Sequence, residues 1–454
     1  MHKELESILA RADVDYADVR YEVKQTTDIG FSGKELTGLS SCSADGYVLR
    51  VLKDGGLATV AFTSPSDADR ALAAASTNAS LIGRHSKRPV ELAKTDVVED
   101  VIEPNLDEDP RERTVEEKLD LLRRYNELAH DHSKVATTNI TYADVVREKW
   151  FASTEGTRVR EDLVTVRISG TITTSEGDLT QSVRVGMGGS DGMGRLRGRE
   201  DLVEDRKKLA VDLLQAEPVK GGAHSVVLDQ QLAGVFTHEA FGHFSEADLI
   251  EDSPTMRDKM RLGAKLGTDV LCIKDDPTIK NQLGFYRYDD EGVRARPVQL
   301  MKNGELTGRL HSRRTAAAFG EPLSGHCIAE DYRYAPIIRM GTIFIEPGED
   351  SFDELLERMG DGLYLVSHMG GQTSGENFTF GAQYGFEVKG GKLGKMVRDI
   401  NISGNLYTTL KSIRGVTGDL KLGEIGGCGK GQLNVRSCYG APHVLIDGVV
   451  IGGR

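Results

Sequence analysis

Residues 224–246, which read HSVVLDQQLAGVFTHEAFGHFSE, place a short apolar strand directly before an apolar helix. The strand is expected over residues 224–228, where valine and leucine predominate. Asp229 is a typical helix N-cap, and the residues after it predict a helix over 230–245. Because Pro218 and Gly221-Gly222 interrupt the chain just before this stretch, we expect a separate C-terminal part to begin here.

The same helix carries His238, Glu239 and His243, two histidines with a glutamate beside the first. Neutral imidazoles are common zinc ligands, and a neighbouring carboxylate is placed to take a proton from an attacking water molecule. The plainer interpretation is a regular helix with one half-exposed histidine and one that is hydrogen-bonded. We favour a hydrolytic metal site, because this combination of residues rarely occurs by chance.

The spacing of the two histidines differs from the common His-Glu-x-x-His motif, in which they are four residues apart on one helix face. His238 and His243 are five residues apart, which separates them by about 140° on a regular helix. A π-helical turn has about 4.4 residues and reduces that angle to about 50°. We therefore predict an irregular helix, with a π-like turn or a break near Gly242, whose backbone freedom would ease the distortion.

A catalytic zinc site usually has three protein ligands, so a third is needed. The candidates are His311, His326, Cys327, His368, Cys428 and Cys438. Cys428 is favoured because the glycines around it would let the backbone approach an ion, and Lys430 could hold a thiolate. A small buried cysteine in a turn explains Cys428 equally well, and Cys438 is its rival as a ligand.

The numbers and positions of glycine and cysteine residues indicate the kind of fold in the C-terminal part. Of the 52 glycines, 36 follow residue 219, which indicates many turns and close backbone contacts in the C-terminal part. The five cysteines are too sparse and widely spaced for a disulfide framework. We expect a glycine-rich, mainly antiparallel β domain that carries the metal site.

The first 219 residues alternate between predicted helices and strands. Helices are expected over residues 3–12, 66–80 and 199–216, and strands over 17–23, 46–52, 57–62 and within 134–187. Asp54-Gly55-Gly56 is a typical hairpin turn, and residues 114–117, TVEE, form a capping box that begins another helix. These patterns predict N-terminal α/β units and an α+β fold overall.

Residues 96–112 contain eight acidic side chains and two prolines, which is typical of a linker or of a solvated loop inside one domain. We predict an N-terminal domain over residues 1–95, a middle domain with a β-meander over 96–219, and a C-terminal metallopeptidase domain over 220–454.

The charge balance limits the partners. With 57 basic and 70 acidic residues, the formal net charge is −13, which argues against nucleic acid or an anionic membrane as the main partner. No apolar run reaches the roughly 18 residues of a membrane span, and the first residues do not resemble a signal peptide. We therefore expect a cytoplasmic protein that binds neither nucleic acid nor membrane.

Short motifs extend the pattern beyond the two histidines. They are HEAFGHFSE at 238–246, YDDEG at 288–292, LHSRRTA at 310–316, RM at 339–340, HMGGQTSG at 368–375 and GCGK at 427–430. Together they resemble the TldD subfamily of the TldD/PmbA proteins, also called modulators of DNA gyrase and classed as zinc metalloproteases. Residues 324–327, SGHC, and 435–442, VRSCYGAP, depart from the glycine-rich sequences usual in that family, and the second places Cys438 near the site.

The resemblance implies roles for individual residues. His238, His243 and Cys428 would bind one Zn²⁺ per chain, and Glu239 would be the catalytic base. The TldE/PmbA subfamily lacks the His-Glu motif, so the resemblance places this chain on the catalytic side. It also implies a partner, either a TldE/PmbA-type sister subunit or another copy in a homo-oligomer, and an enclosed site that short or unfolded peptides reach.

These observations favour a zinc-dependent metallopeptidase of the TldD type. The alternatives are a metal-containing binding protein that modulates a toxin, an antitoxin or a topoisomerase without hydrolysis, and a zinc amidase of small molecules. Glu239 favours hydrolysis, because a structural zinc site needs no carboxylate beside a ligand. Further candidates for contacting the substrate or supporting a ligand are Glu246, His311 and His368.

Overall fold

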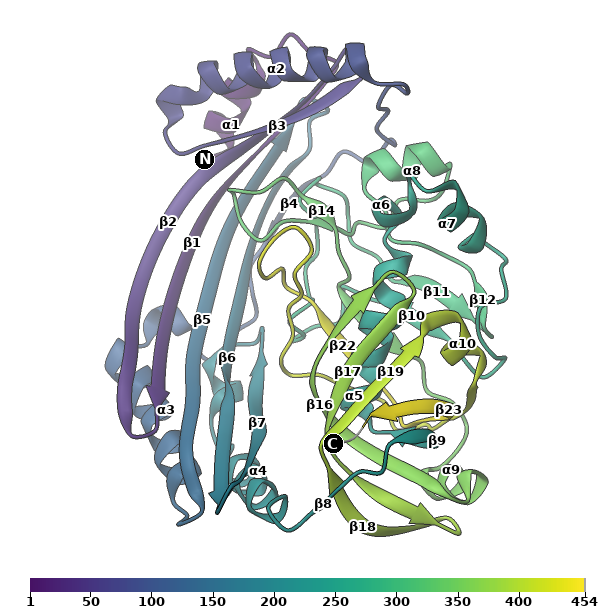
Figure 1. Ribbon diagram of the computed structural model, residues 1–454. Helices are drawn as coiled ribbons and strands as arrows, with labels where there is room; N and C mark the ends of the chain where they lie inside the picture. The colour runs from purple at the N-terminus through teal and green to yellow at the C-terminus, as the bar shows by residue number, and fades with distance from the viewer. Residues whose placement is uncertain (453–454) are drawn as a thin grey trace.

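A long, curved sheet forms the N-terminal part of the molecule (Figure 1). The computed structural model describes residues 1–452. The strand order is β3-β2-β1-β5-β6-β4, and β7 pairs with β6. The strands are β1 (Tyr16–Ser32), β2 (Glu35–Lys53), β3 (Gly56–Phe62), β4 (Glu99–Ile102), β5 (Val135–Ser153), β6 (Arg158–Glu176) and β7 (Leu179–Gly189). The predicted N-terminal and middle domains therefore contribute strands to one sheet, and the division between them stays a prediction.

Helices lie at both ends of this sheet, α1 and α2 at one end and α3 and α4 at the other (Figure 1). Their bounds are α1 (His2–Leu9), α2 (Ala68–His85), α3 (Val115–His130) and α4 (Glu200–Asp212). The predicted capping box is present, since the side chains of Thr114 and Glu117 each accept a hydrogen bond from the other's main-chain N–H. The predicted hairpin turn joins β2 to β3, with positive φ at Asp54 and Gly55 as a tight turn of this hand requires.

The acidic segment over residues 96–112 contributes a strand as well as loops. Within it, β4 pairs in parallel with β6 at the edge of the sheet. Most of β4 is exposed to solvent, which explains why its sequence is acidic rather than apolar.

The C-terminal part is built around a closed set of strands. β16, β9, β23, β19 and β17 are paired in that order, and β17 pairs again with β16, which closes the ring. β18 and β8 extend it from β17, and β20 pairs with β23. The strands are β8 (Glu217–Pro218), β9 (Gly222–Leu228), β16 (Gly362–Ser374), β17 (Asn377–Lys389), β18 (Lys392–Arg398), β19 (Ile400–Asn405), β20 (Ile413–Val416) and β23 (Val444–Gly452).

A further sheet, of order β12-β11-β10-β15-β22-β21, and the pair β13–β14 complete the C-terminal part. Their bounds are β10 (Ile273–Asp275), β11 (Val298–Lys302), β12 (Glu305–Leu306), β13 (Cys327–Ile328), β14 (Ile337–Ile338), β15 (Thr342–Ile345), β21 (Lys421–Leu422) and β22 (Cys438–Ala441). The α-helices are α5 (Gln230–Phe236), α6 (Ala247–Ile250), α7 (Pro254–Lys259), α8 (Arg313–Phe319), α9 (Phe352–Met359) and α10 (Leu406–Lys411). The predicted α+β class, with a mainly antiparallel C-terminal part, is confirmed.

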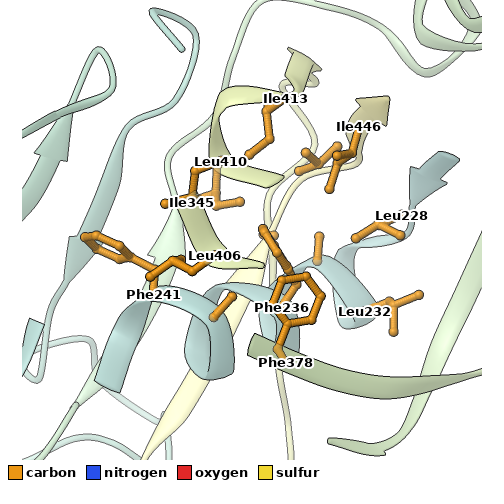
Figure 2. Packing of buried hydrophobic residues seen from close by; sticks show 14 of the residues in the cluster. Leu228, Leu232, Phe236, Phe241, Ile345, Phe378, Leu406, Leu410, Ile413 and Ile446 are labelled. Atoms are coloured by element: carbon orange, nitrogen blue, oxygen red, sulfur yellow. The ribbon is translucent and has the colours of Figure 1, made fainter. Parts of the chain in front are cut away.

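The core of the C-terminal part surrounds α5 (Figure 2). Leu232 and Phe236 of α5 are buried there, and the ring of Phe236 meets that of Phe378 edge-on at 5.5 Å. Burial of each such side chain contributes about 1.5–3 kcal/mol. The helix that leads to His238 is thus fixed by the core before the histidine is reached.

No helix within residues 1–452 combines the length and the apolar character that crossing a membrane demands.

Candidate metal centre

His238 and Glu239 lie in a π-helical turn, Thr237–Phe241, which continues α5. The N–H of Gly242 donates to the carbonyl of Thr237, five residues earlier. A 3-10 turn, Gly242–Ser245, then carries His243. The wide turn brings the ring centroids of His238 and His243 within 5.2 Å, and the predicted irregularity near Gly242 is confirmed.

Glycine suits position 242 for a different reason from the one expected. Its φ and ψ are −55° and −48°, ordinary helical values that any residue adopts. A Cβ at this position would lie 2.2 Å from Sδ of Met340 and 3.0 Å from Cδ1 of Ile343. The glycine therefore provides space for β15 and the preceding chain to pack against the turn, not backbone freedom.

Cys428 reaches the two histidines from a glycine-rich loop. Its backbone exchanges two hydrogen bonds of 3.0 Å with Val435. Gly427 has a φ of +123°, and a Cβ there would meet Oδ1 of Asn434 at 2.1 Å, so this loop needs glycine before the cysteine. Sγ of Cys428 lies 3.4 Å from Nε2 of His243, and the ligand atoms of His238, His243 and Cys428 are all within 4.8 Å of one another.

Cys428 and His243 form a thiolate–imidazolium contact, and a metal ion bound here would displace the proton on Nε2 of His243. Burial alone would raise the pKa of the Cys428 thiol, but hydrogen bonding to His238 and His243 lowers it to about 5. Burial would lower the pKa of His243, and contacts with Cys428 and Glu246 instead raise it to about 10. Two imidazole nitrogens and a thiolate are a donor set that zinc prefers to magnesium or calcium. The three side chains therefore fit a zinc ion.

Glu246 contacts the ring nitrogen of His243 that points away from Cys428. Nδ1 of His243 donates to Oε2 of Glu246 at 3.2 Å, which leaves Nε2 facing Cys428. Burial would raise the pKa of Glu246, but His243 and the charge of Lys430 lower it to about 2, so it is ionised at neutral pH. Lys430, expected beside a thiolate, instead contacts Glu246 and Asp248, each at 2.9 Å.

Glu239 lines a cavity and contacts Thr373. Oγ1 of Thr373 lies 2.8 Å from the main-chain oxygen of Glu239 and 3.3 Å from its Oε2. The cavity has a volume of about 470 Å³ and lies between the N-terminal sheet and the C-terminal part. Its lining includes Arg167, Thr171 and Arg184 of β6 and β7, with His238, Glu239 and Tyr439 opposite them.

The other sequence candidates fall into two groups. His368 lines the same cavity. His311 is buried elsewhere, where its ring nitrogens contact Thr315 at 3.1 Å and Glu321 at 2.9 Å, so neither nitrogen is free for a substrate. His326 contacts Asp275, and burial raises the pKa of the Cys327 thiol.

Cys438 is separated from the two histidines. It lies in β22, where its Sγ contacts Oε1 of Gln282 at 3.3 Å and the carbonyl of Gly423 at 3.2 Å. Burial raises the pKa of its thiol to about 12. In geometry and in charge, Cys428 is the better ligand of the two.

Family models match three successive parts of the chain. They describe PmbA/TldA metallopeptidase domain 1 over residues 17–79, the central domain over 108–214 and the C-terminal domain over 221–453. A metalloprotease of Synechocystis sp. is 35% identical over 446 residues, which cover 98% of this chain and 96% of that protein. The chain belongs to the PmbA/TldA metallopeptidase family. A zinc metalloprotease TldD homologue of Saccharolobus solfataricus is 32% identical over 74% of this chain and 76% of its own length.

Two solved structures share the fold of this chain. A putative modulator of DNA gyrase from Thermotoga maritima has a TM-score of 0.80 at 20% identity, covering 99% of this chain and all of that one. TldE from Thermococcus kodakarensis has a TM-score of 0.79 at 18% identity, with the same coverage.

Three residues of this PmbA/TldA family member were not predicted as members of a site: Arg184 and Tyr439, which line the cavity, and Thr373, which contacts Glu239. Thr373 stood only within a family motif, Tyr439 within a stretch noted for its departure from the family, and Arg184 in a strand with no distinguishing pattern. Each comes from an element far along the chain from the histidines. Only the strand pairings bring them together, and no local spacing reports such pairings.

Proposed function

We propose that this chain is a zinc-dependent peptidase of the TldD type that hydrolyses short or unfolded peptides. The observation that carries the proposal is a carboxylate, Glu239, at a cavity and directly beside one member of a His238, His243 and Cys428 cluster whose ligand atoms lie within 4.8 Å. The metalloprotease names of its relatives support the same reaction class.

In this proposal His238, His243 and Cys428 hold one zinc ion per chain. Three protein ligands leave a coordination position open, as catalytic zinc sites require. A zinc ion supplies Lewis-acid polarisation of the scissile carbonyl and makes water a better nucleophile. Glu246 fixes the ring of His243, because a ligand histidine is oriented by the partner of its other nitrogen.

Glu239 acts as the general base. Its carboxylate takes a proton from the attacking water and passes it to the leaving amine. Thr373 restrains the glutamate through contacts to its main chain and its carboxylate, so the base is held at the cavity rather than free in solvent.

The alternative of a binding protein without hydrolysis has less support. A structural zinc site more often has four protein ligands and no adjacent carboxylate. We also propose that the chain works with a TldE/PmbA-type sister subunit or as a homo-oligomer. The support is membership of a family in which TldE shares this fold.

The test is Glu239→Gln. Glutamine keeps the size of the side chain but cannot accept a proton at neutral pH, so kcat for peptide cleavage should fall by about 10²–10⁴-fold. Zinc content and melting temperature should match the parent, since Glu239 is not among the clustered ligand atoms. The control is Glu116→Gln, an exposed glutamate of α3, which should leave all three quantities unchanged.

Cleavage is measured on a peptide library, with and without a chelator and with and without a sister subunit. Peptide cleavage by Glu239→Gln within a few-fold of the parent would exclude Glu239 as the base. If the zinc-loaded parent cleaves no peptide even with the sister subunit, the peptidase proposal is wrong.

A further inference from the structure

A row of hydrogen-bonded side chains crosses the cavity beside the candidate metal centre. Nη1 of Arg184, from β7, lies 3.2 Å from Nδ1 of His368, and Nε2 of His368 lies 2.9 Å from Oη of Tyr439. The three residues come from β7, β16 and β22. All three line the cavity together with His238 and Glu239.

The chemistry of this row fixes the direction of its hydrogen bonds. A guanidinium group has only donors, so Nδ1 of His368 must accept from Arg184 and carry no proton. Burial and the charge of Arg184 lower the pKa of His368 to about 4, which keeps the ring neutral. The proton is therefore on Nε2, and His368 donates to the hydroxyl oxygen of Tyr439.

The hydroxyl proton of Tyr439 is then available to a second partner. Among residues 1–452 the Tyr439 hydroxyl has no other hydrogen-bond partner. The ring lies close to Gly234, where a Cβ would be 2.9 Å from its Cδ2, and it meets the ring of His238 edge-on at 6.1 Å, so its packing restrains it. A rigid O–H donor of this kind faces the cavity in which the proposed reaction takes place.

We propose that Tyr439 is the oxyanion donor of this peptidase. Its hydroxyl would donate a hydrogen bond to the scissile carbonyl oxygen as negative charge develops there, and its O–H bond would not break. His368 and Arg184 would be positioning residues that act through Tyr439. The inference rests on the proposed peptidase function. It gives His368 an indirect role instead of a direct contact with the carbonyl oxygen, because the one N–H of His368 already donates to Tyr439.

Donors of this type act mainly on the transition state. In the zinc-loaded full chain, Tyr439→Phe should lower kcat for a cleaved peptide by about 10²–10³-fold. KM, zinc content and melting temperature should stay close to the parent, because phenylalanine keeps the packed ring. Tyr407→Phe, which removes a buried α10 hydroxyl that has no hydrogen-bond partner within residues 1–452, is the matched control and should leave kcat unchanged.

A binding experiment separates the transition state from the ground state. A phosphinic peptide presents a tetrahedral, negatively charged group in place of the scissile carbonyl. Tyr439→Phe should weaken its affinity, measured by calorimetry, by about 10²-fold. Affinity for the uncleaved peptide, measured in the Glu239→Gln background, should change by less than about threefold.

The positioning role is tested by a double-mutant cycle. His368→Ala should lower kcat in the parent, and His368→Gln, whose amide N–H can still reach Tyr439, should restore part of it. In the Tyr439→Phe background, His368→Ala should have almost no further effect on kcat, because its action passes through the missing hydroxyl. Additive effects of the two substitutions would exclude that route.

The outcomes distinguish this inference from the proposed function. If Glu239→Gln abolishes cleavage while Tyr439→Phe keeps kcat and phosphinic-peptide affinity within about threefold of the parent, the donor role is wrong and the peptidase stands. If the parent neither cleaves peptides nor binds the phosphinic peptide, the peptidase proposal fails, and the donor role fails with it.

Discussion

At the scale of single residues, Cys428 and Cys438 show how environment decides which cysteine can bind a metal. Cys428 is half-buried beside two imidazoles that favour its thiolate, whereas burial of Cys438 outweighs its main-chain hydrogen bonds and the charge of Arg195 and favours the thiol. Thiolates bind zinc, so the ligand role follows the charge state.

We therefore expect Cys428→Ala to lose most of its zinc and Cys438→Ala to keep it. Removing one of three ligands leaves a pair of histidines that cannot hold the ion against dialysis. Metal analysis of both purified variants after dialysis measures this, and circular dichroism confirms that both are folded. Full zinc in Cys428→Ala together with loss in Cys438→Ala would transfer the ligand role to Cys438.

The residues that could be predicted from sequence are those whose chemistry is local. His238, Glu239 and His243 lie within six residues, and glycines mark the loop of Cys428, so spacing alone indicates a site. Tyr439 joins them only because β22 pairs in parallel with β15, beside the turn that carries the histidines. His311 shows the reverse case. Its place in a family motif made it a candidate, but its ring is buried against Thr315 and Glu321.

At the scale of elements, the π-turn was predictable because two rings five residues apart cannot share one ion on a regular helix. The role of Gly242 was not, because its reason lies in the packing of Met340 and Ile343 from a distant part of the chain. The spacing of residues along one helix can be read from the sequence, whereas the packing of distant residues against that helix cannot.

Gly242→Ala should therefore destabilise the protein and weaken zinc binding. The new methyl group would overlap Met340, which is fully buried and has little room to move, and such overpacking costs about 1–3 kcal/mol. The melting temperature and the zinc dissociation constant of the variant measure the two effects. Gly38→Ala in β2 is the control, since a Cβ there meets no atom of the described chain within 4 Å.

An unchanged melting temperature and zinc affinity in Gly242→Ala would show that Met340 moves aside at no cost. Backbone freedom is not an alternative explanation for a loss, because alanine adopts the φ and ψ of Gly242 readily.

At the scale of the whole molecule, buried charges join the N-terminal sheet to the C-terminal part. Arg50 of β2 contacts Oε1 of Glu291 at 2.7 Å and also the carboxylate of Asp18, and all three side chains are buried. Lys149 of β5 contacts Asp290 at 3.0 Å. The motif at 288–292, quoted above as a family mark, thus supplies charges to this contact rather than a ligand to the metal cluster.

The overall architecture could be predicted from the sequence only in part. Alternating strands and capped helices predicted an α+β chain, because those patterns are local. The union of residues 16–62 and 135–189 in one sheet depends on pairing between β1 and β5, whose partners are more than a hundred residues apart. The burial of Arg50 likewise could not be predicted from the sequence, because charged side chains are normally expected at the surface.

Arg50→Met tests how much the buried charges stabilise the molecule. Burial alone would lower the pKa of Arg50, but Asp18 and Glu291 raise it well above its usual value, so the guanidinium is charged at every pH at which the protein is folded. Methionine fills much of the same space but leaves two buried carboxylates without this cation. Removing one partner from a buried ion pair costs about 3–5 kcal/mol, and we expect the unfolding free energy in urea to fall by that amount.

The control and a rescue make the Arg50 experiment specific. Arg70→Met removes an arginine whose side chain is 82% exposed and paired to Asp67, and its effect should stay within about 0.5 kcal/mol. Adding Glu291→Gln to Arg50→Met removes one of the stranded charges, so the double variant should recover part of the lost stability. If Arg50→Met is as stable as Arg70→Met, the ion pairs that Arg50 makes do not stabilise the contact between the two parts. The contact that encloses the cavity would then depend on apolar packing and on the remaining buried pairs, such as Lys149 with Asp290.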